Sequence, residues 1–239
     1  MRSLLPTFCS RAKALPFLVC LLLLVGCNPL TTTTTAPDIC AGAFNFCLQG
    51  QAQVRMETVH GTILLEVDGE AAPVTAGNFI DLVRRGTYDG TVFHRVVREP
   101  VPFIVQGGDP ISANPKTPKE QFGTGSFVDP DSGQVRTIPL EVKLKTESEP
   151  RYGRLTTSPS DLLQLQLSHE RGALAMARSQ APDSASAQFY IALRPLPELD
   201  GRYAVFGRVI EGLEVVDAIQ QDDLILRISA ILTTPSPSV

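Results

Sequence analysis

One arginine stands between apolar residues in the stretch FHRVVREPVPFIVQGGDP, which runs from Phe93 to Pro110. The guanidinium of Arg95 is always charged, planar and rich in hydrogen-bond donors. Its chemistry is therefore donation and electrostatic stabilisation rather than proton transfer. After a proline-rich interruption the apolar run resumes and ends at Gln106, whose amide both donates and accepts. What the arginine acts on depends on the residues that surround this stretch.

Other reactive residue types show no arrangement of their own. His60, His94 and His169 lack the spacing of metal ligands, and the carboxylates form no recognisable pair. Serine-bearing turns lack the context of a hydrolase nucleophile. The segment GTGSF, Gly123 to Phe127, lacks the lysine and the strand-to-helix setting of a phosphate-binding loop. We expect no metal and no cofactor.

The length and composition favour one large domain. The chain has 239 residues, of which 43% are hydrophobic, so it can fill a core. Its formal net charge of −4 provides no basic surplus to neutralise phosphates, which argues against nucleic acid as a partner. We expect a monomer.

The pattern of elements predicts a mainly β fold. Residues 72–86 predict a helix, because Pro73 lies near the start, apolar residues follow at helical spacing, and arginines and Gly86 mark the end. Residues 213–220 predict a second short helix. Apolar and β-branched runs bounded by turn residues predict strands at 61–67, 171–178, 187–193, 202–210 and 224–232. Without β-α-β alternation, these elements favour an antiparallel barrel or sandwich.

Several motifs in this order resemble one family. They are NFIDLVRRGTYDGTVFHR, FHRVV, FIVQGGD, GALAMAR, AQFYIAL and LDGRYAVFGRVIEGLEVVDAI. Together they resemble the cyclophilin-type peptidyl-prolyl cis-trans isomerases over about residues 56 to 232, apart from an enlarged region at 110–168. The resemblance implies a closed eight-stranded antiparallel barrel capped by two helices. It also implies an enzyme that accelerates rotation of X-Pro bonds in polypeptides without a cofactor.

The resemblance implies the site residues too. Arg95 corresponds to the catalytic donor, and GTGSF resembles a loop of the substrate groove. The residues expected to bind substrate are Phe103, Ile104, Gln106, Ala177, Arg178, Gln188, Tyr190, Leu199 and Tyr203.

Strand alternation makes a geometric prediction about part of this set. Ile104 and Gln106 should share one face of their strand, because alternate residues point to the same side. Gln188 and Tyr190 should likewise share one face, with Phe189 on the other.

Four features depart from the family pattern. Arg178 stands where the family commonly has asparagine, Tyr190 where it usually has phenylalanine, and Glu198 where many members have a cyclosporin-binding tryptophan. The loop at 98–102 is also longer than usual and could displace Phe103. Glu198 argues against strong cyclosporin binding. The enlarged region at 110–168, Arg178 and Tyr190 leave an alternative function open, a catalytically weak module that binds proline-containing peptides as a chaperone. A lipoprotein binding a small solute on an unrelated barrel is a third possibility.

The first 27 residues predict export. Positive residues precede an apolar run at 14–25, which is short for a bilayer span and right for a secretory signal. The alternative is an uncleaved anchor helix. The ending LVGC resembles the lipobox of bacterial lipoproteins, which would make Cys27 a lipid anchor on a membrane facing the periplasm or another extracytoplasmic space.

The remaining boundaries follow from composition. Residues 28–53, which include TTTTTAP, are expected to form a flexible tether, 54–232 the isomerase domain and 233–239 a frayed tail. Cys40 and Cys47 remain after the signal and lipid cysteines, and could form a disulfide or two free thiols in an exported chain.

Overall fold

The computed structural model of the chain describes residues 39–42 and 44–231. These residues belong to one compact unit. The export signal with Cys27, the threonine run and the tail at 233–239 lie outside the described residues.

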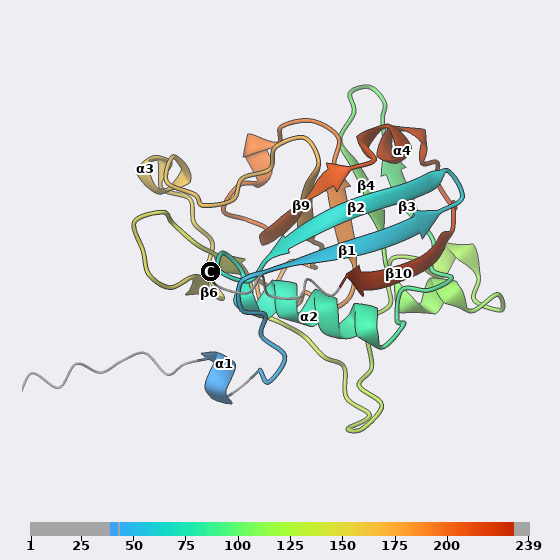
Figure 1. The fold of residues 1–239 in the computed structure, drawn as a ribbon, viewed down its shortest axis with the longest axis horizontal. Helices are drawn as coiled ribbons and strands as arrows, with labels where there is room; N and C mark the ends of the chain where they lie inside the picture. The colour runs from blue at the N-terminus through green and yellow to red at the C-terminus, as the bar shows by residue number, and fades with distance from the viewer. Residues whose placement is uncertain (1–38, 43, 232–239) are drawn as a thin grey trace, which may run out of the picture. The chain divides into compact units, whose positions relative to one another are not determined.

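Eight strands form one antiparallel sheet (Figure 1), in the order β10-β1-β2-β9-β7-β8-β4-β3. Alternation explains why these sequences form strands: in β2, for example, Ile63, Leu65 and Val67 are buried, and the residues between them are more exposed. The strands are β1 Gln51–Thr58, β2 Gly61–Asp68, β3 Arg95–Val97, β4 Ile104–Gly107, β7 Ala173–Met176, β8 Phe189–Ala192, β9 Val205–Glu211 and β10 Ile225–Ile231.

The expected closed barrel is not supported, because this sheet is open. Its order ends at β10 on one side and β3 on the other. The segments just before these two strands meet at an isolated antiparallel bridge between Val92 and Leu224 and through a few backbone hydrogen bonds, such as the Phe93 N–H to the Asp223 carbonyl, but β3 and β10 do not pair. The edge strand β3 is only three residues long, which leaves little backbone to pair with β10.

The two expected helices are present, α2 at Pro73–Arg84 and α4 at Leu213–Ala218. Helix α2 lies against β2, β9 and β10 (Figure 1). Its Phe79 ring contacts the rings of Tyr88, Phe189 and Phe206, with centroids 5.2 to 5.5 Å apart. The smaller elements are α1 Ile39–Gly42, α3 Pro159–Leu162 and the 3-10 turns Pro110–Ala113, Lys119–Gln121 and Pro197–Leu199.

The enlarged region at 110–168 contributes to the core as well as to the surface. It contains the two-stranded sheet of β5 Glu141–Val142 and β6 Arg151–Tyr152. Several of its apolar side chains are buried in the main core, among them Phe127, Ile138, Leu140, Val142, Leu144 and Leu165. The region is therefore partly a structural layer of the domain.

The packed part of the chain begins before residue 54, the boundary expected from composition. Strand β1 starts at Gln51, and Cys40 and Cys47 are joined by a disulfide. The disulfide segment packs on α2: the Leu48 N–H donates to the carbonyl of Pro73 at 3.0 Å. A Cβ at Gly77 would meet the Phe46 carbonyl oxygen, so only glycine permits this approach.

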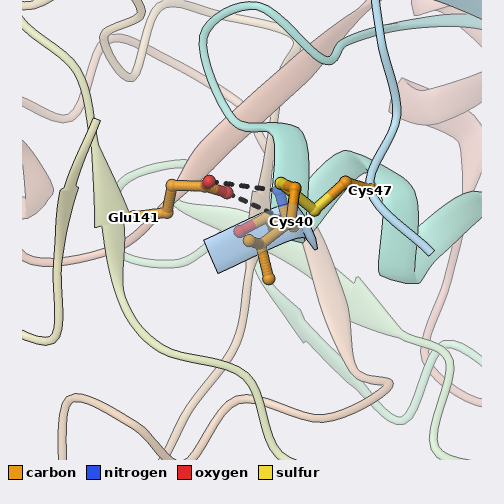
Figure 2. The surroundings of a disulfide bond; sticks show 5 residues. Cys40, Cys47 and Glu141 are labelled. Atoms are coloured by element: carbon orange, nitrogen blue, oxygen red, sulfur yellow. Dashed lines mark hydrogen bonds between the residues drawn. A yellow bond between two sulfur atoms is a disulfide. The ribbon is translucent and has the colours of Figure 1, made fainter. Parts of the chain in front are cut away.

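A buried carboxylate caps α2 from the enlarged region. The helix begins after Ala72, which has no side chain to cap it. Glu141 of β5 instead accepts hydrogen bonds from the N–H groups of Val74 at 3.1 Å and Thr75 at 2.8 Å. Figure 2 draws the Cys40–Cys47 disulfide and Glu141 together. Burial raises the pKa of Glu141 from 4.5 to about 7, although the Thr75 N–H partly opposes the shift.

This pKa makes a prediction about stability. The carboxyl group binds a proton more readily in the folded chain than in the unfolded chain, so protonation stabilises the fold. This stabilisation is fully present below pH 4.5 and is lost as pH rises towards 7. The difference corresponds to about 3 kcal/mol of unfolding free energy. Glu141→Gln should remove this component of the pH dependence in denaturant titrations between pH 4.5 and 7.5. Glu211→Gln, at an exposed position of β9, is the matched control. An unchanged slope in Glu141→Gln would contradict the assignment.

Candidate active site

Strand alternation divides the side chains of β4 and β8 between two clusters. Val105 of β4 and Phe189 of β8 are buried in the main core. Ile104 and Tyr190 belong to a second apolar cluster on the opposite face, packed with partly buried Phe103, Leu199 and Tyr203 among others. The prediction that alternate residues of these strands face opposite sides is thus confirmed.

The second cluster lines a cavity of about 300 Å³, which we call the Arg95 cavity. An adjoining cavity of about 330 Å³, the Gln188 cavity, is lined largely by polar residues that include the loop at 123–126. Gln106, Ala177 and Arg178 line both. The Arg95 cavity is lined by Arg95, Phe103, Ile104, Gln106, Ala177, Arg178, Tyr190, Leu199 and Tyr203.

All the expected site residues of the domain therefore lie along one groove. Gln188 is the one outside the first cavity, and it lines the second.

The long loop at 98–102 leaves the site intact. Strands β3 and β4 pair with Arg95 opposite Gln106 and Val97 opposite Ile104, and the Phe103 N–H donates to the Val97 carbonyl at 2.9 Å. The loop extends beyond this ladder, where Arg98 donates to two carbonyls at the end of α4. Phe103 is consequently held in the cavity and is not displaced.

A chain of amides orients Arg95. The Gln188 side chain donates two hydrogen bonds through its NH2 group to loop carbonyls, one to Gly123 at 3.0 Å and one to Gly125 at 2.9 Å. Its oxygen is thus left to accept from Gln106 Nε2 at 3.2 Å, and the Gln106 oxygen faces Arg95 Nη1 at 3.4 Å. The two loop carbonyls thus set the direction of every hydrogen bond in this series, which ends with the Gln106 oxygen as an acceptor beside the guanidinium of Arg95.

Asp109 fixes the loop that starts this chain. Its side chain is buried, and Oδ2 accepts from the N–H groups of Gly123 at 2.6 Å and Gly125 at 3.1 Å. A Cβ at Gly125 would collide with the Asp109 carboxylate, so glycine is required there. The sequence presents Asp109 only as the end of the QGGD motif and does not indicate this role, because the contact spans 14 to 16 residues of chain.

His169 supports the wall of the Arg95 cavity, which the sequence analysis did not anticipate. Its Nε2 lies 2.8 Å from the Tyr190 hydroxyl, and its Nδ1 lies 2.7 Å from Asp200 Oδ1. The Tyr190 ring also makes an edge contact with Tyr203, with centroids 5.9 Å apart. The sequence held one signal for this contact: Tyr190 stands where the family usually has phenylalanine, and a buried hydroxyl requires a hydrogen-bond partner.

The electrostatics of the site keep Tyr190 neutral. Burial raises the pKa of Tyr190 well above its ordinary value, so the hydroxyl keeps its proton.

Among residues 39–42 and 44–231, no group of three or more His, Cys, Asp or Glu side chains could hold a metal ion. Within the same ranges, no helix has both the length and the apolar character to cross a membrane.

Comparison with known sequences identifies the family. The profile described as "Cyclophilin type peptidyl-prolyl cis-trans isomerase/CLD" matches residues 53–230. A protein from Synechocystis named for a thylakoid lumen peptidyl-prolyl cis-trans isomerase is 36% identical over 195 residues, which are 77% of this chain and 48% of that protein. The chain thus spans about half the length of that relative. Peptidyl-prolyl cis-trans isomerase ppi1 of Schizosaccharomyces pombe is 34% identical over 69% of this chain and 82% of its own length.

A solved structure agrees with the sequence match. The cyclophilin-type isomerase of Cryptosporidium parvum, crystallised in the presence of the dipeptide Ala-Pro, aligns with a TM-score of 0.55 and 25% identity. The alignment covers 76% of this chain and 99% of that one. With a groove assembled from the residues that the motifs indicated, the chain belongs to the cyclophilin-type peptidyl-prolyl cis-trans isomerase family.

Proposed function

We propose that this chain catalyses cis-trans isomerisation of X-Pro bonds with Arg95 as the catalytic donor. One observation carries the proposal: a charged donor and an apolar cup of Phe103, Ile104 and Leu199 line the same cavity. The cup accommodates the proline ring, while Gln106 and Gln188 align the peptide. The backbone beside Ala177 and Arg178 completes the groove, with Tyr203 on its far wall.

The reaction needs little reactive chemistry. Resonance in the amide holds up a rotational barrier of ~18–20 kcal/mol, and no bond is broken during rotation. In the twisted transition state the proline nitrogen recovers its lone pair and becomes a better hydrogen-bond acceptor. A donor held at that nitrogen therefore binds the transition state more tightly than the planar ground state. The amide chain from Gln188 through Gln106 holds Arg95 for this purpose.

His169 acts as a positioning residue in this proposal. An unpaired Tyr190 hydroxyl would place an unsatisfied polar group in the wall of the proline cup, at a cost of about 1–3 kcal/mol. The hydrogen bond to His169 satisfies that hydroxyl, so the tyrosine ring can serve where the family usually has phenylalanine. Asp200 holds His169 in turn and lies next to Leu199 of the opposite wall.

We also propose that the enzyme acts outside the cytoplasm, as a bacterial lipoprotein anchored through Cys27 by the signal at 1–27. The domain would then extend from its tether and act on exported or membrane-associated proteins as they fold. Two facts support this location: the Synechocystis relative is named for the thylakoid lumen, and the Cys40–Cys47 disulfide suits an oxidising compartment. The lipobox-like LVGC motif supports the anchor itself.

Arg95→Ala tests the mechanism. Loss of a donor that acts only in the transition state should lower kcat/KM for an X-Pro peptide by about 10²–10³-fold. Arg55→Ala, at an exposed position of β1, is the matched control and should retain full activity. The measurement is isomer exchange in a short peptide by NMR. Equal rates for Arg95→Ala and the unaltered protein would remove Arg95 from the mechanism. Peptide binding without acceleration in the unaltered protein would favour the chaperone alternative.

A double-mutant cycle tests the support of the cup. His169→Ala should raise KM more than it lowers kcat, with kcat/KM falling about tenfold, because the Tyr190 hydroxyl loses its partner. Adding Tyr190→Phe removes that hydroxyl and should recover most of the loss in KM. A double variant no better than His169→Ala would show that the hydrogen bond is not what positions the wall.

Cys27→Ser tests the anchor independently of catalysis. The unaltered chain should sediment with membranes after expression in a bacterium with lipoprotein processing. The variant lacks the sulfur that carries the lipid and should move to the soluble extracytoplasmic fraction. Membrane association that persists in Cys27→Ser would instead support an uncleaved anchor helix.

A further inference from the structure

The geometry points to Arg178 as a specificity residue that makes the groove prefer substrates with an acidic side chain in the two residues preceding the proline. This inference rests on the proposed isomerase function and names a substrate class for that site. It concerns the charge of Arg178, whereas the expected family contact at this position involves the backbone.

Arg178 is held rigidly between two loops. Its Nε and Nη2 donate to the carbonyl of Arg202 at 3.0 and 2.6 Å, and its Nη1 donates to the carbonyls of Ser179 and Gln180 at 2.8 and 3.0 Å. The guanidinium lies over the Tyr203 ring, 4.7 Å from its centroid. These contacts fix the position of the charge, so little side-chain entropy remains to be lost when a ligand binds.

The charge of Arg178 has no acidic partner in the described part of the chain. All the partners above are neutral, and Arg178 takes part in none of the ion pairs among residues 39–42 and 44–231. No aspartate or glutamate lines either the Arg95 cavity or the Gln188 cavity. The groove is therefore positive, although the whole chain has a net charge of −4.

Of the three carboxylates on neighbouring loops, two are paired elsewhere and one is exposed. Asp200 is bonded to His169, and Glu198 pairs with Arg194 at 2.7 Å. The exposed Asp183 lies beside Gly153 of the enlarged region. None of these groups neutralises the groove by direct pairing with Arg178.

The position of Arg178 relates it to the substrate. It lines both the Arg95 cavity, which we assign to the proline ring, and the Gln188 cavity next to it. A peptide whose proline occupies the first cavity and whose preceding residues reach the second must pass Arg178. A carboxylate on those residues meets an unneutralised guanidinium, whereas an ammonium group meets a like charge.

The experiment compares peptides that carry Glu, Gln or Lys at each of the two positions before one proline. For the unaltered chain, kcat/KM should be about tenfold higher for Glu than for Lys at one of these positions, and salt should reduce the ratio. Arg178→Lys loses most of the carbonyl contacts but should retain the preference, because it keeps the positive charge. Arg178→Gln should bring the ratio below about twofold. Arg227→Gln, at an exposed position of β10, makes the same change in net charge and should leave the ratio unaltered.

The outcomes separate this inference from the isomerase proposal. If the unaltered chain accelerates exchange of the Gln peptides but shows no preference for Glu, the specificity inference is wrong and the proposed function stands. A preference retained in Arg178→Gln would also overturn it. If no peptide is accelerated, the proposed function fails. The charge preference is then tested by equilibrium binding, as the ratio of the Kd values of the Lys and Glu peptides.

Discussion

The pairing of β4 with both β3 and β8 is the constraint on which the groove depends. Gln106 lies opposite Arg95 on one side and opposite Tyr190 on the other. Because side chains alternate along each strand, this register places the arginine, the amide and the aromatic wall on one face and sends Val105, Phe189 and Ile191 into the core. A shift of one residue in β4 would exchange the two sets and remove both the groove and part of the core.

Around this register, the proposed mechanism relies on fixed hydrogen-bond donors where many enzymes use groups that transfer protons. Asp109 holds a loop, two carbonyls of that loop set the polarity of the glutamine amides, and the last amide oxygen faces Arg95. His169 performs the corresponding task for the aromatic wall. Groups held before the substrate arrives need little reorganisation as the amide twists, which is what electrostatic stabilisation of a transition state requires.

Parts of the enlarged region and the disulfide segment have a structural role around α2. Glu141 supplies the cap that α2 lacks in its own sequence, and the residues next to Cys47 pack on the same helix. Arg136 of the enlarged region joins these parts, since it pairs with Asp81 of α2 and lies over the Phe46 ring, 4.8 Å from its centroid. These additions therefore lengthen the family domain without disturbing the β3–β4 hairpin.

The sequence alone determined the elements and most of the groove. Apolar periodicity located α2, α4 and the strands β2, β7, β8, β9 and β10, because these patterns are local and each reflects one buried face, whereas it did not locate β1. The motifs then indicated Arg95 and its neighbours, which the fold brings to one groove, although the roles of these residues remain proposals. The long loop at 98–102 left the position of Phe103 open, since its length alone does not show whether the β3–β4 register survives.

Only the tertiary structure decided the rest. Contacts such as Glu141 with α2, Asp109 with the loop at 123–125 and His169 with Tyr190 join residues 14 to 67 positions apart, and no local pattern encodes them. Whether the sheet closes into a barrel likewise depends on how β3 and β10 are placed in the folded chain. The charge of Arg178 is visible in the sequence, but only the fold shows that its partners are neutral carbonyls. Burial, pairing and register are properties of the assembled chain, because each depends on segments that the sequence keeps far apart.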